Sequence, residues 1–296
     1  MLTKDKADKL IEIFVTVDDF CLYLDDWLED HPNIEFDKPR FEGIMHISEI
    51  LSIIIFYHYS GYKCFQYYYE DQVQQALSSY FPVQVSYKRF LQLISKSIPH
   101  LYVFNKWQSL KTQATGVYFI DSKKLPVCHN RRIHNHKVFK DIAQRGRTST
   151  GWFYGMKLHL VINNLGQIVN FTFTSGNTAD ANPEVLKHVF LKLKGNCYGD
   201  KGYLSKVFGE LYRNGLKLVT KLRKNMKNKL MPIAEKYQLY KRAVIESVFD
   251  LLMTVFDIDH TRHRSPRNAM AHMLGALAAY SFMDQKPVVL LPKLIK

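Results

Sequence analysis

Three acidic residues, Asp121, Asp200 and Glu246, stand at positions where the sequence predicts strand ends or a helix start. Asp121 ends a short β-rich run. Asp200 follows an apolar run and lies between Gly199 and Gly202, which let the backbone pass close to a neighbouring group. Glu246 comes one turn into a predicted helix. Because open α/β sheets place their chemistry at the carboxyl ends of strands, these acids are the first candidates for a functional site.

Three converging carboxylates suit hard cations, since oxygen ligands are the ones that Mg²⁺ selects. Two Mg²⁺ ions roughly 3.5–4 Å apart activate the attacking oxygen and stabilise the leaving oxygen of a phosphodiester displacement. We therefore predict a site for two Mg²⁺ ions, in which Mn²⁺ is expected to substitute. The carboxylates repel one another without metal, so an empty site is expected to be unstable. The alternative is three independent acids, forming a turn, a cap and a helical ion pair between Glu246 and Arg242.

A second metal hypothesis rests on the segment that follows Asp121, which contains Cys128, His129, His134 and His136. This spacing lacks the tight ligand pairs that are typical of zinc sites. The segment is also basic, with eight Lys and Arg residues against Asp141 alone over residues 123–147. Contact with phosphate or solvent is therefore the favoured interpretation of these histidines.

The elements that must position the acids predict an α/β fold. They are a strand ending at Asp121, a hairpin over 152–161 and 168–174, a helix over 184–193, a strand ending at Asp200, a helix over 206–214, a strand over 216–220 and a helix over 242–256. This order matches a ribonuclease H-like mixed sheet of three antiparallel and then two parallel strands, flanked by helices. In that topology the first and fourth strands are neighbours, so Asp121 and Asp200 can meet although 78 residues lie between them.

Charge divides the chain into two parts. Residues 1–115 contain 11 Lys and Arg against 15 Asp and Glu, and residues 116–296 contain 30 against 12, a net charge of +18. A basic field of this size usually meets a polyanion, with nucleic acid ahead of a membrane surface. A merely soluble basic surface is the alternative.

Residues 1–112 are predicted to form an all-α domain that precedes a catalytic domain over 113–296. The first helix is acidic, with apolar residues at helical spacing between Leu10 and Leu24, and a last helix is expected over about 266–282. Short helices between residues 44 and 112 are compatible with a helix-turn-helix-like module that binds DNA. A dimerisation or packing domain is the equal alternative.

Four scattered cysteines, without any CxxC pair, are typical of reduced thiols in a cytosolic protein. The start of the chain is interrupted by charges such as Lys4 and Asp5, and the longest apolar runs are too short to span a bilayer. We therefore expect a cytoplasmic protein, without membrane association.

Seven motifs together carry a family resemblance. They are Ile120-Asp121-Ser122, Arg145-Gly146-Arg147-Thr148-Ser149, Gly155-Met156-Lys157-Leu158-His159-Leu160, Gly199-Asp200-Lys201-Gly202-Tyr203, Thr220-Lys221-Leu222-Arg223-Lys224-Asn225, Arg242-Ala243-Val244-Ile245-Glu246 and Arg262-His263-Arg264-Ser265. With these motifs the chain resembles prokaryotic insertion-sequence transposases of the DDE type, and within them the nine-eighty-two group of insertion elements. The resemblance covers residues 116–285, and the helical N-terminal part more loosely.

The resemblance implies a divalent-metal enzyme that cleaves DNA at the inverted-repeat ends of its element and transfers the strand into target DNA. It makes Asp121, Asp200 and Glu246 the catalytic, metal-binding acids. Residues expected to contact DNA are Lys201, Lys221, Arg223, Lys224, Arg242 and Arg262. The implied partner is double-stranded DNA, namely the terminal repeats and the target. A homodimer is expected, since two element ends must be paired, and in the cell the protein would be associated with the nucleoid through DNA.

One position departs from the family pattern. The family usually places a lysine seven residues after its glutamate, and here that position is Met253. A thioether does not pair with a terminal phosphate, so we expect weaker binding of the DNA ends or weaker strand transfer. Two alternatives stay open beside the transposase: a nuclease of the same fold that does not join strands, and a catalytically silent DNA-binding protein derived from a transposase.

Overall fold

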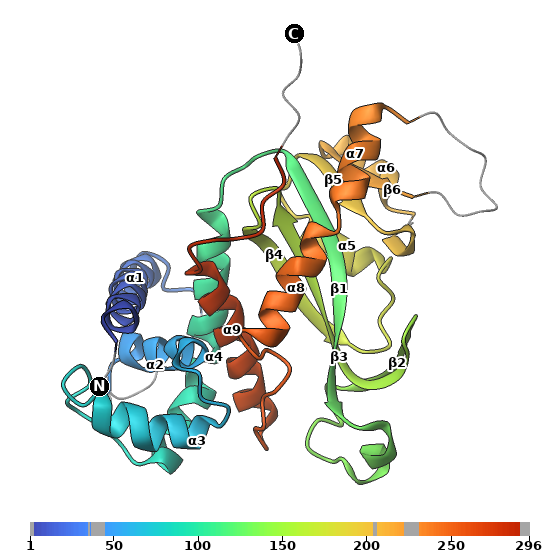
Figure 1. The fold of residues 1–296 in the computed structure, drawn as a ribbon. Helices are drawn as coiled ribbons and strands as arrows, with labels where there is room; N and C mark the ends of the chain where they lie inside the picture. Colours follow the sequence, from blue (N-terminus) through green and yellow to red (C-terminus); the bar gives the residue numbers. More distant parts are fainter. Residues whose placement is uncertain (1–2, 35, 37–44, 204–205, 222–230, 291–296) are drawn as a thin grey trace. The chain divides into compact units, whose positions relative to one another are not determined.

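The computed structural model of the chain describes residues 3–34, 36, 45–203, 206–221 and 231–290. The chain folds into two compact units (Figure 1). Unit 1 comprises Met1–Gln108 and Leu252–Met283, and unit 2 comprises Ser109–Leu251 and Asp284–Lys296. The last helix therefore belongs with the N-terminal helices, whereas the sequence analysis grouped residues 113–296 together.

Unit 1 is built from helices. The first, α1 (Lys4–Asp30), buries the apolar stripe that its sequence predicted, from Leu10 to Leu28, and leaves its acidic face in solvent. Helix α2 (Ile47–Ser60) is buried along almost its whole length and packs against both α1 and α9 (Pro266–Ser281). Gly275 permits the close approach of α9, since a Cβ there would lie 2.8 Å from Cγ2 of Ile54. These helices form the core of the unit.

The middle of unit 1 is less regular than the sequence predicted. Instead of one helix, a single turn of α-helix, α3 (Phe65–Tyr67), continues as a π-helix over Tyr68–Ala76. The wider π turn buries the rings of both Tyr68 and Tyr69. Helix α4 (Tyr87–Leu110) then begins after Ser86, whose carbonyl oxygen accepts from Phe90 N, and it continues through Pro99.

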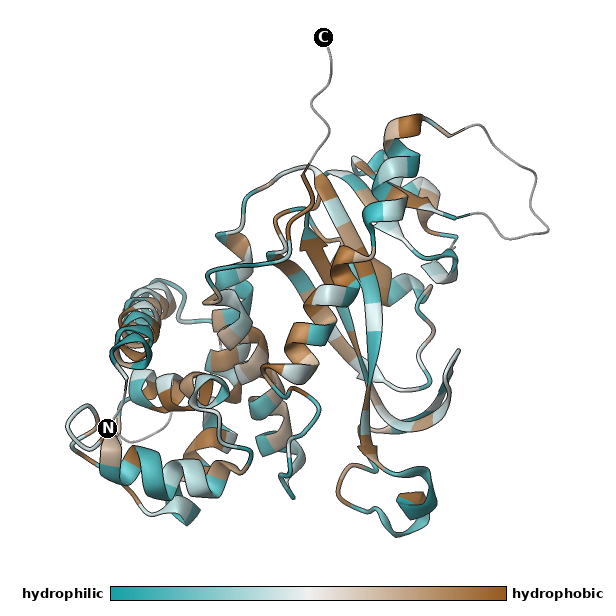
Figure 2. Cartoon of the chain, viewed as in Figure 1, coloured by the Kyte–Doolittle hydropathy of each residue, from teal (hydrophilic) through white to brown (hydrophobic). Residues whose placement is uncertain are grey.

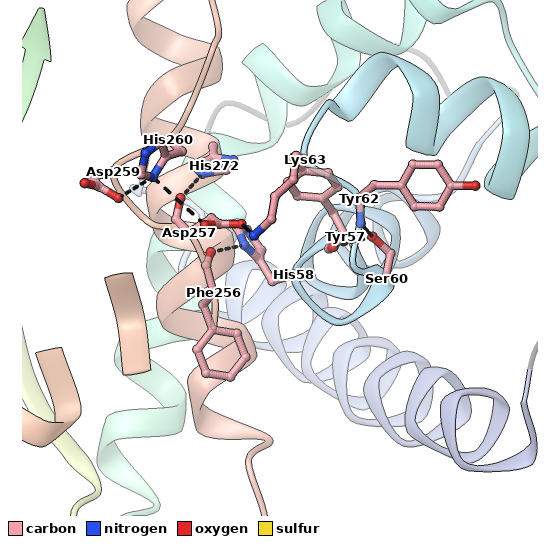
Figure 3. A network of polar contacts seen from close by, with 10 residues as sticks. All are labelled: Tyr57, His58, Ser60, Tyr62, Lys63, Phe256, Asp257, Asp259, His260 and His272. Atoms are coloured by element: carbon pink, nitrogen blue, oxygen red, sulfur yellow. Dashed lines mark hydrogen bonds and ion pairs between the residues drawn. The ribbon is translucent and has the colours of Figure 1, made fainter. Parts of the chain in front are cut away.

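A network of polar contacts joins α2 to the segment that leads into α9 (Figure 3). His58 Nδ1 donates to the carbonyl oxygen of Phe256 at 2.6 Å, and His272 Nε2 donates to that of Asp257 at 2.8 Å. The Lys63 ammonium pairs with the Asp257 carboxylate. Both imidazoles are buried, so these bonds satisfy one nitrogen of each ring inside the protein.

This network predicts that unit 1 loses stability in acid. Burial lowers the pKa of His272 to about 4, with opposing contributions from Asp257 and Asp259, and it lowers the pKa of His263, which lies beside His272, to about 4 as well. Because these folded values lie below the unfolded value, the unfolded chain binds more protons, and stability falls as the pH drops from about 6.5 to 4. At roughly 1.4 kcal/mol per pKa unit, His272 accounts for at most roughly 3 kcal/mol.

Urea unfolding at pH 7 and pH 4.5 measures this loss. His272→Gln keeps a donor for the Asp257 carbonyl but does not titrate, so we expect a smaller pH dependence than in the parent protein. His31→Gln changes an exposed histidine of the same unit and is the matched control. An unchanged pH dependence in His272→Gln contradicts the prediction.

Unit 2 is built on a six-stranded mixed sheet with the order β2-β3-β1-β5-β6, in which β4 also pairs with β3. Its strands are β1 (Val117–Cys128), β2 (Gln144–Thr148), β3 (Gly151–Asn163), β4 (Ile168–Ser175), β5 (Gly195–Gly199) and β6 (Leu216–Thr220). β1, β3 and β4 are antiparallel, while β5 and β6 run parallel to β1. The predicted ribonuclease H-like arrangement is therefore confirmed, including the contact between the first strand and β5.

The helices of unit 2 pack their apolar residues against the sheet. Figure 2 shows hydrophobic residues along the strands. Helices α5 (Pro183–Val189) and α6 (Phe208–Arg213) cover the face of β1 that carries Tyr118 and Ile120. Helix α8 (Val244–Thr254) begins in this unit, and the ring of its Phe249 lies 6.0 Å from the ammonium of Lys123, on the opposite face. Two elements were not predicted: β2 and helix α7 (Ile233–Lys241).

Among the described residues, no helix combines the length and the apolar character that spanning a bilayer requires.

Candidate functional site

Asp121 lies in the middle of β1, on the face opposite α5 and α6. The prediction that this strand ends at Asp121 was wrong, because β1 continues to Cys128 in antiparallel pairing with β3. Its Oδ2 accepts from Arg242 Nη1 at 3.1 Å, and its Oδ1 accepts from the backbone N–H of Ser122 at 2.8 Å. Burial raises the pKa of Asp121, and the Ser122 N–H and the Arg242 guanidinium oppose that rise. This carboxylate has therefore lost part of its contact with water, and the Ser122 N–H and the Arg242 guanidinium stabilise its negative charge.

Asp200 directly follows β5, the parallel neighbour of β1. The last register pair between these strands joins Phe119 to Tyr198, whose ring centroids lie 5.9 Å apart on the same face. Asp121 and Asp200 each come two residues later. Because side chains alternate with a period of two, Asp121 lies on that face, and we infer the same face for Asp200, which directly follows β5. The backbone N–H of Lys201 donates to Asp200 Oδ1 at 2.7 Å.

Of the two glycines around Asp200, Gly199 is required by the packing of the protein itself. A Cβ on Gly199 would lie 3.0 Å from Cγ2 of Ile120 and 3.3 Å from the ring of Tyr203. Gly199 thus faces the buried side of the sheet, away from the acids. Gly202 has more space, with Asp180 Oδ2 as its nearest atom at 3.9 Å.

Glu246 lies in the first turn of α8 and is exposed, while the preceding residue, Ile245, is buried in the core. Its Oε1 accepts from Arg242 Nη2 at 3.2 Å, so one guanidinium bridges the first and third acids. The side chain of Arg242 is 17% exposed and that of Glu246 is 58% exposed. The predicted helical pair of Arg242 and Glu246 is therefore present, and it also reaches the sheet through Asp121.

The donors of this site fit a hard cation in their chemistry. The three acids offer only carboxylate oxygens, and Asp121, which is half-buried, already gains from positive charge nearby because burial disfavours its charged form. In the part of the chain that the structure describes, no group of three His, Cys, Asp or Glu side chains lies close enough together to hold a metal ion. Arg242 supplies the positive charge between Asp121 and Glu246 in this structure.

The residues of the zinc hypothesis make other contacts. His129 Nδ1 accepts from the backbone N–H of Arg131 at 3.3 Å, and the ring of His136 stacks on Phe139 with centroids 5.5 Å apart. Cys128 lies at the end of β1 and is half-buried. Here too, among the described residues, no three His, Cys, Asp or Glu side chains lie close enough together to hold a metal ion.

The predicted DNA contacts fall into three groups. Lys201 directly follows Asp200, and Lys221 follows Thr220, the register partner of Gly199; both lysines are exposed. Arg242 is engaged by two carboxylates, and Arg262 is exposed in unit 1 with a positive φ of 44°. Arg223 and Lys224 lie outside the described residues.

The sequence analysis missed a fourth acid, Asp180, which lies in the loop between β4 and α5. Its Oδ1 accepts from Ser122 Oγ at 2.7 Å and from Lys157 Nζ at 3.1 Å. Ser122 and Lys157 belong to the motifs that carry the family resemblance. Asp180 lies among Gly, Asn and Thr residues that are typical of an ordinary turn. Lys157, in the middle of the apolar strand β3, could have indicated this acid from the sequence, since a buried lysine needs a carboxylate partner.

Comparison with known proteins agrees with this arrangement. No curated protein and no solved structure matches the chain. A family model described as a transposase DDE domain matches residues 111–266, which include Asp121, Asp200 and Glu246. Because the match spans more than half of the chain, the chain belongs to this family of transposase DDE domains.

Proposed function

We propose that the protein is a DNA transposase that cleaves DNA at the ends of its insertion element and joins the freed 3′-hydroxyl to target DNA. The observation that supports this proposal is that Asp121, on β1, and Asp200, directly after β5, each come two residues after the register pair Phe119 and Tyr198, while Arg242 links Glu246 to Asp121. The family supports a transposase and, in general, an enzyme that uses divalent metal ions.

Asp121, Asp200 and Glu246 are the residues that would hold two Mg²⁺ or Mn²⁺ ions. When bound, such ions stabilise the charge that develops on the phosphate during an in-line displacement. In that displacement an oxygen forms a new bond to phosphorus while the bond from phosphorus to the 3′-oxygen breaks. Arg242 would exchange its carboxylate partners for a phosphate oxygen of the DNA, because guanidinium binds both groups in the same forked geometry.

The remaining basic residues supply attraction to the DNA backbone. We assign this role to Lys201 and Lys221, which are both exposed, and to Arg223, Lys224 and Arg262. Residues 1–112 would bind the terminal repeats or form the dimer, and residues 113–296 would carry the chemistry. Such a protein would act as a homodimer on DNA in the cytoplasm of a prokaryotic cell.

Incubation with labelled duplex DNA tests the proposal directly. The substrate is the imperfect inverted repeat expected to flank the reading frame, with supercoiled plasmid as target and Mg²⁺, Mn²⁺ or EDTA added. We expect cleavage and joined product with either metal and neither with EDTA. Cleavage without joining favours the nuclease and points to Met253, whereas binding without cleavage favours the silent DNA-binding protein.

Removal of Arg242 is expected to make the stability of the protein depend more strongly on Mg²⁺. Arg242→Gln leaves Asp121 and Glu246 without their shared cation, which for a partly exposed pair costs about 1 kcal/mol, or a few degrees in melting temperature. Added Mg²⁺ should restore more of this stability in the variant than it adds to the parent protein, since no guanidinium competes with the metal. Thermal unfolding with Mg²⁺ and with EDTA measures the difference.

Arg213→Gln is the matched control, because Arg213 is exposed on α6 and its Nε donates to the Gly209 carbonyl oxygen of the same helix at 3.2 Å. Its response to Mg²⁺ should equal that of the parent protein. An equal response in Arg242→Gln would show that Arg242 and the metal do not share the carboxylates.

A further inference from the structure

A second polar cluster lies on β1, directly behind the acids. It consists of Ser122, Lys157 and Asp180, which come from β1, β3 and the loop before α5. Since successive side chains of a strand point to opposite faces, Ser122 faces α5 and α6 while Asp121 faces the other way. The register supports this, because Lys157 pairs with Lys124 and His159 with Ser122 across the two strands.

The cluster is held by short contacts around one carboxylate oxygen. Asp180 Oδ1 accepts from Ser122 Oγ at 2.7 Å and from Lys157 Nζ at 3.1 Å, and Lys157 also donates to the carbonyl oxygen of Thr178 at 2.9 Å. The Lys157 side chain is only 8% exposed. A lysine buried to this degree is retained only with a fixed partner, so the loop that carries Asp180 is anchored to β3.

The cluster contacts Asp121 and lies next to the turn that follows Asp200. Ser122 donates its backbone N–H to Asp121 Oδ1 at 2.8 Å while its hydroxyl donates to Asp180. On the other side, Asp180 Oδ2 lies 3.9 Å from the position of a Cβ on Gly202, in the turn that follows Asp200. Tyr203, in the same turn, is buried beside Ser122, Asp121 and Asp180.

We propose that Asp180 is a positioning residue of the acidic site, which fixes Ser122 and thereby the orientation of the Asp121 carboxylate toward the metal ions and Asp200. Asp180 holds the Ser122 hydroxyl, and the backbone N–H of the same serine holds Asp121 Oδ1, so the fixed serine restricts how far the Asp121 carboxylate can turn. Partners that orient a metal-binding carboxylate typically contribute 10- to 100-fold in metal affinity or activity. This inference rests on the proposed function.

The test measures Mn²⁺ affinity by electron paramagnetic resonance of free Mn²⁺, together with kcat and KM for end cleavage. We expect Asp180→Ala and Ser122→Ala each to weaken Mn²⁺ binding about tenfold and to lower kcat with little change in KM for DNA. The double variant should be no worse than either single variant, because both remove the same contact. Asp180→Asn keeps an acceptor for Ser122 and should recover most of the affinity.

Two controls separate the outcomes. Glu184→Gln changes an exposed acid four residues away on α5 and should bind Mn²⁺ as the parent does. Asp121→Asn should lose most Mn²⁺ binding; if it does not, the proposed function fails, and this inference with it. If Asp121→Asn behaves as expected while Asp180→Ala keeps the parent affinity and kcat, only the role of Asp180 is overturned. The role of Asp180 is also overturned if the losses of Mn²⁺ affinity and kcat in the double variant are the sum of those in the single variants, measured at a temperature where all variants are folded.

Discussion

Replacing Asp200 with asparagine is expected to lower the rate of DNA end cleavage by at least about a thousandfold, while binding of the DNA ends is retained. The reason is the position that we infer for Asp200, on the same face of the sheet as Asp121. An amide carries no charge to hold a second cation, and stabilisation of a phosphoryl transition state by metal is worth several kcal/mol, or about three powers of ten in rate. Single-turnover cleavage of labelled end DNA in Mg²⁺ measures the rate.

Asp141→Asn is the control for charge, because Asp141 is an exposed acid in the basic segment of the same unit. It should cleave at the parent rate. Cleavage by Asp200→Asn within about threefold of the parent rate is incompatible with a site that needs all three acids. Loss of DNA binding by Asp200→Asn would place its role in binding instead of in the chemistry.

Gly155→Ala is expected to destabilise unit 2 by about 3 kcal/mol or more, near the upper end of the usual cost of overpacking. Gly155 lies where β3 is paired with both β1 and β2. A Cβ there would lie 2.1 Å from the carbonyl oxygen of Leu125 and 2.9 Å from Cα of Pro126. These are backbone atoms, so no side chain can rotate away, and the strands must separate.

Gly209→Ala is the matched control, since its Cβ would meet no atom within 4 Å and the residue lies in α6. This variant should keep the parent stability or gain up to about 1 kcal/mol from the better helix former. Urea unfolding of the two variants and the parent protein gives the comparison. A Gly155→Ala protein as stable as Gly209→Ala contradicts the register of β1 and β3 around Leu125.

The elements that carry the three acids could be predicted because their local patterns are simple. Asp121 and Asp200 each follow an apolar run with the period of a strand, and the order of elements makes their two strands neighbours. Glu246 follows from the apolar stripe of α8. The bridge that Arg242 makes to Asp121 could not be predicted, because it depends on how α8 lies against the sheet, and no local pattern encodes that.

Charged segments hid two elements of unit 2. Strand β2 (Gln144–Thr148) contains two arginines and pairs only with one end of β3, so no apolar alternation marks it. Helix α7 (Ile233–Lys241) lies in a lysine-rich run and buries only Gln238 and Leu239. In unit 1 the π-helix over Tyr68–Ala76 shifts the helical period, which a search for 3.6-residue spacing does not detect.

Asp180 could not be predicted from the sequence for a different reason. Its partners, Ser122 and Lys157, are 58 and 23 residues away in sequence, and its own surroundings are typical of a turn. The pairing of β3 with both β1 and β4 brings the three together. Long-range polar contacts of this kind leave no periodic trace in a single sequence, although an isolated lysine within an apolar strand indicates that such a partner exists.

The most direct test of a metal site shared by the three acids is the anomalous diffraction of manganese in crystals of the protein bound to its end DNA. We predict anomalous peaks with carboxylate oxygens of Asp121, Asp200 and Glu246 as ligands, and with Arg242 turned from Asp121 to a DNA phosphate. Manganese held without Asp200, or an Asp121 that remains paired with Arg242 while the metal binds elsewhere, would contradict the proposed site.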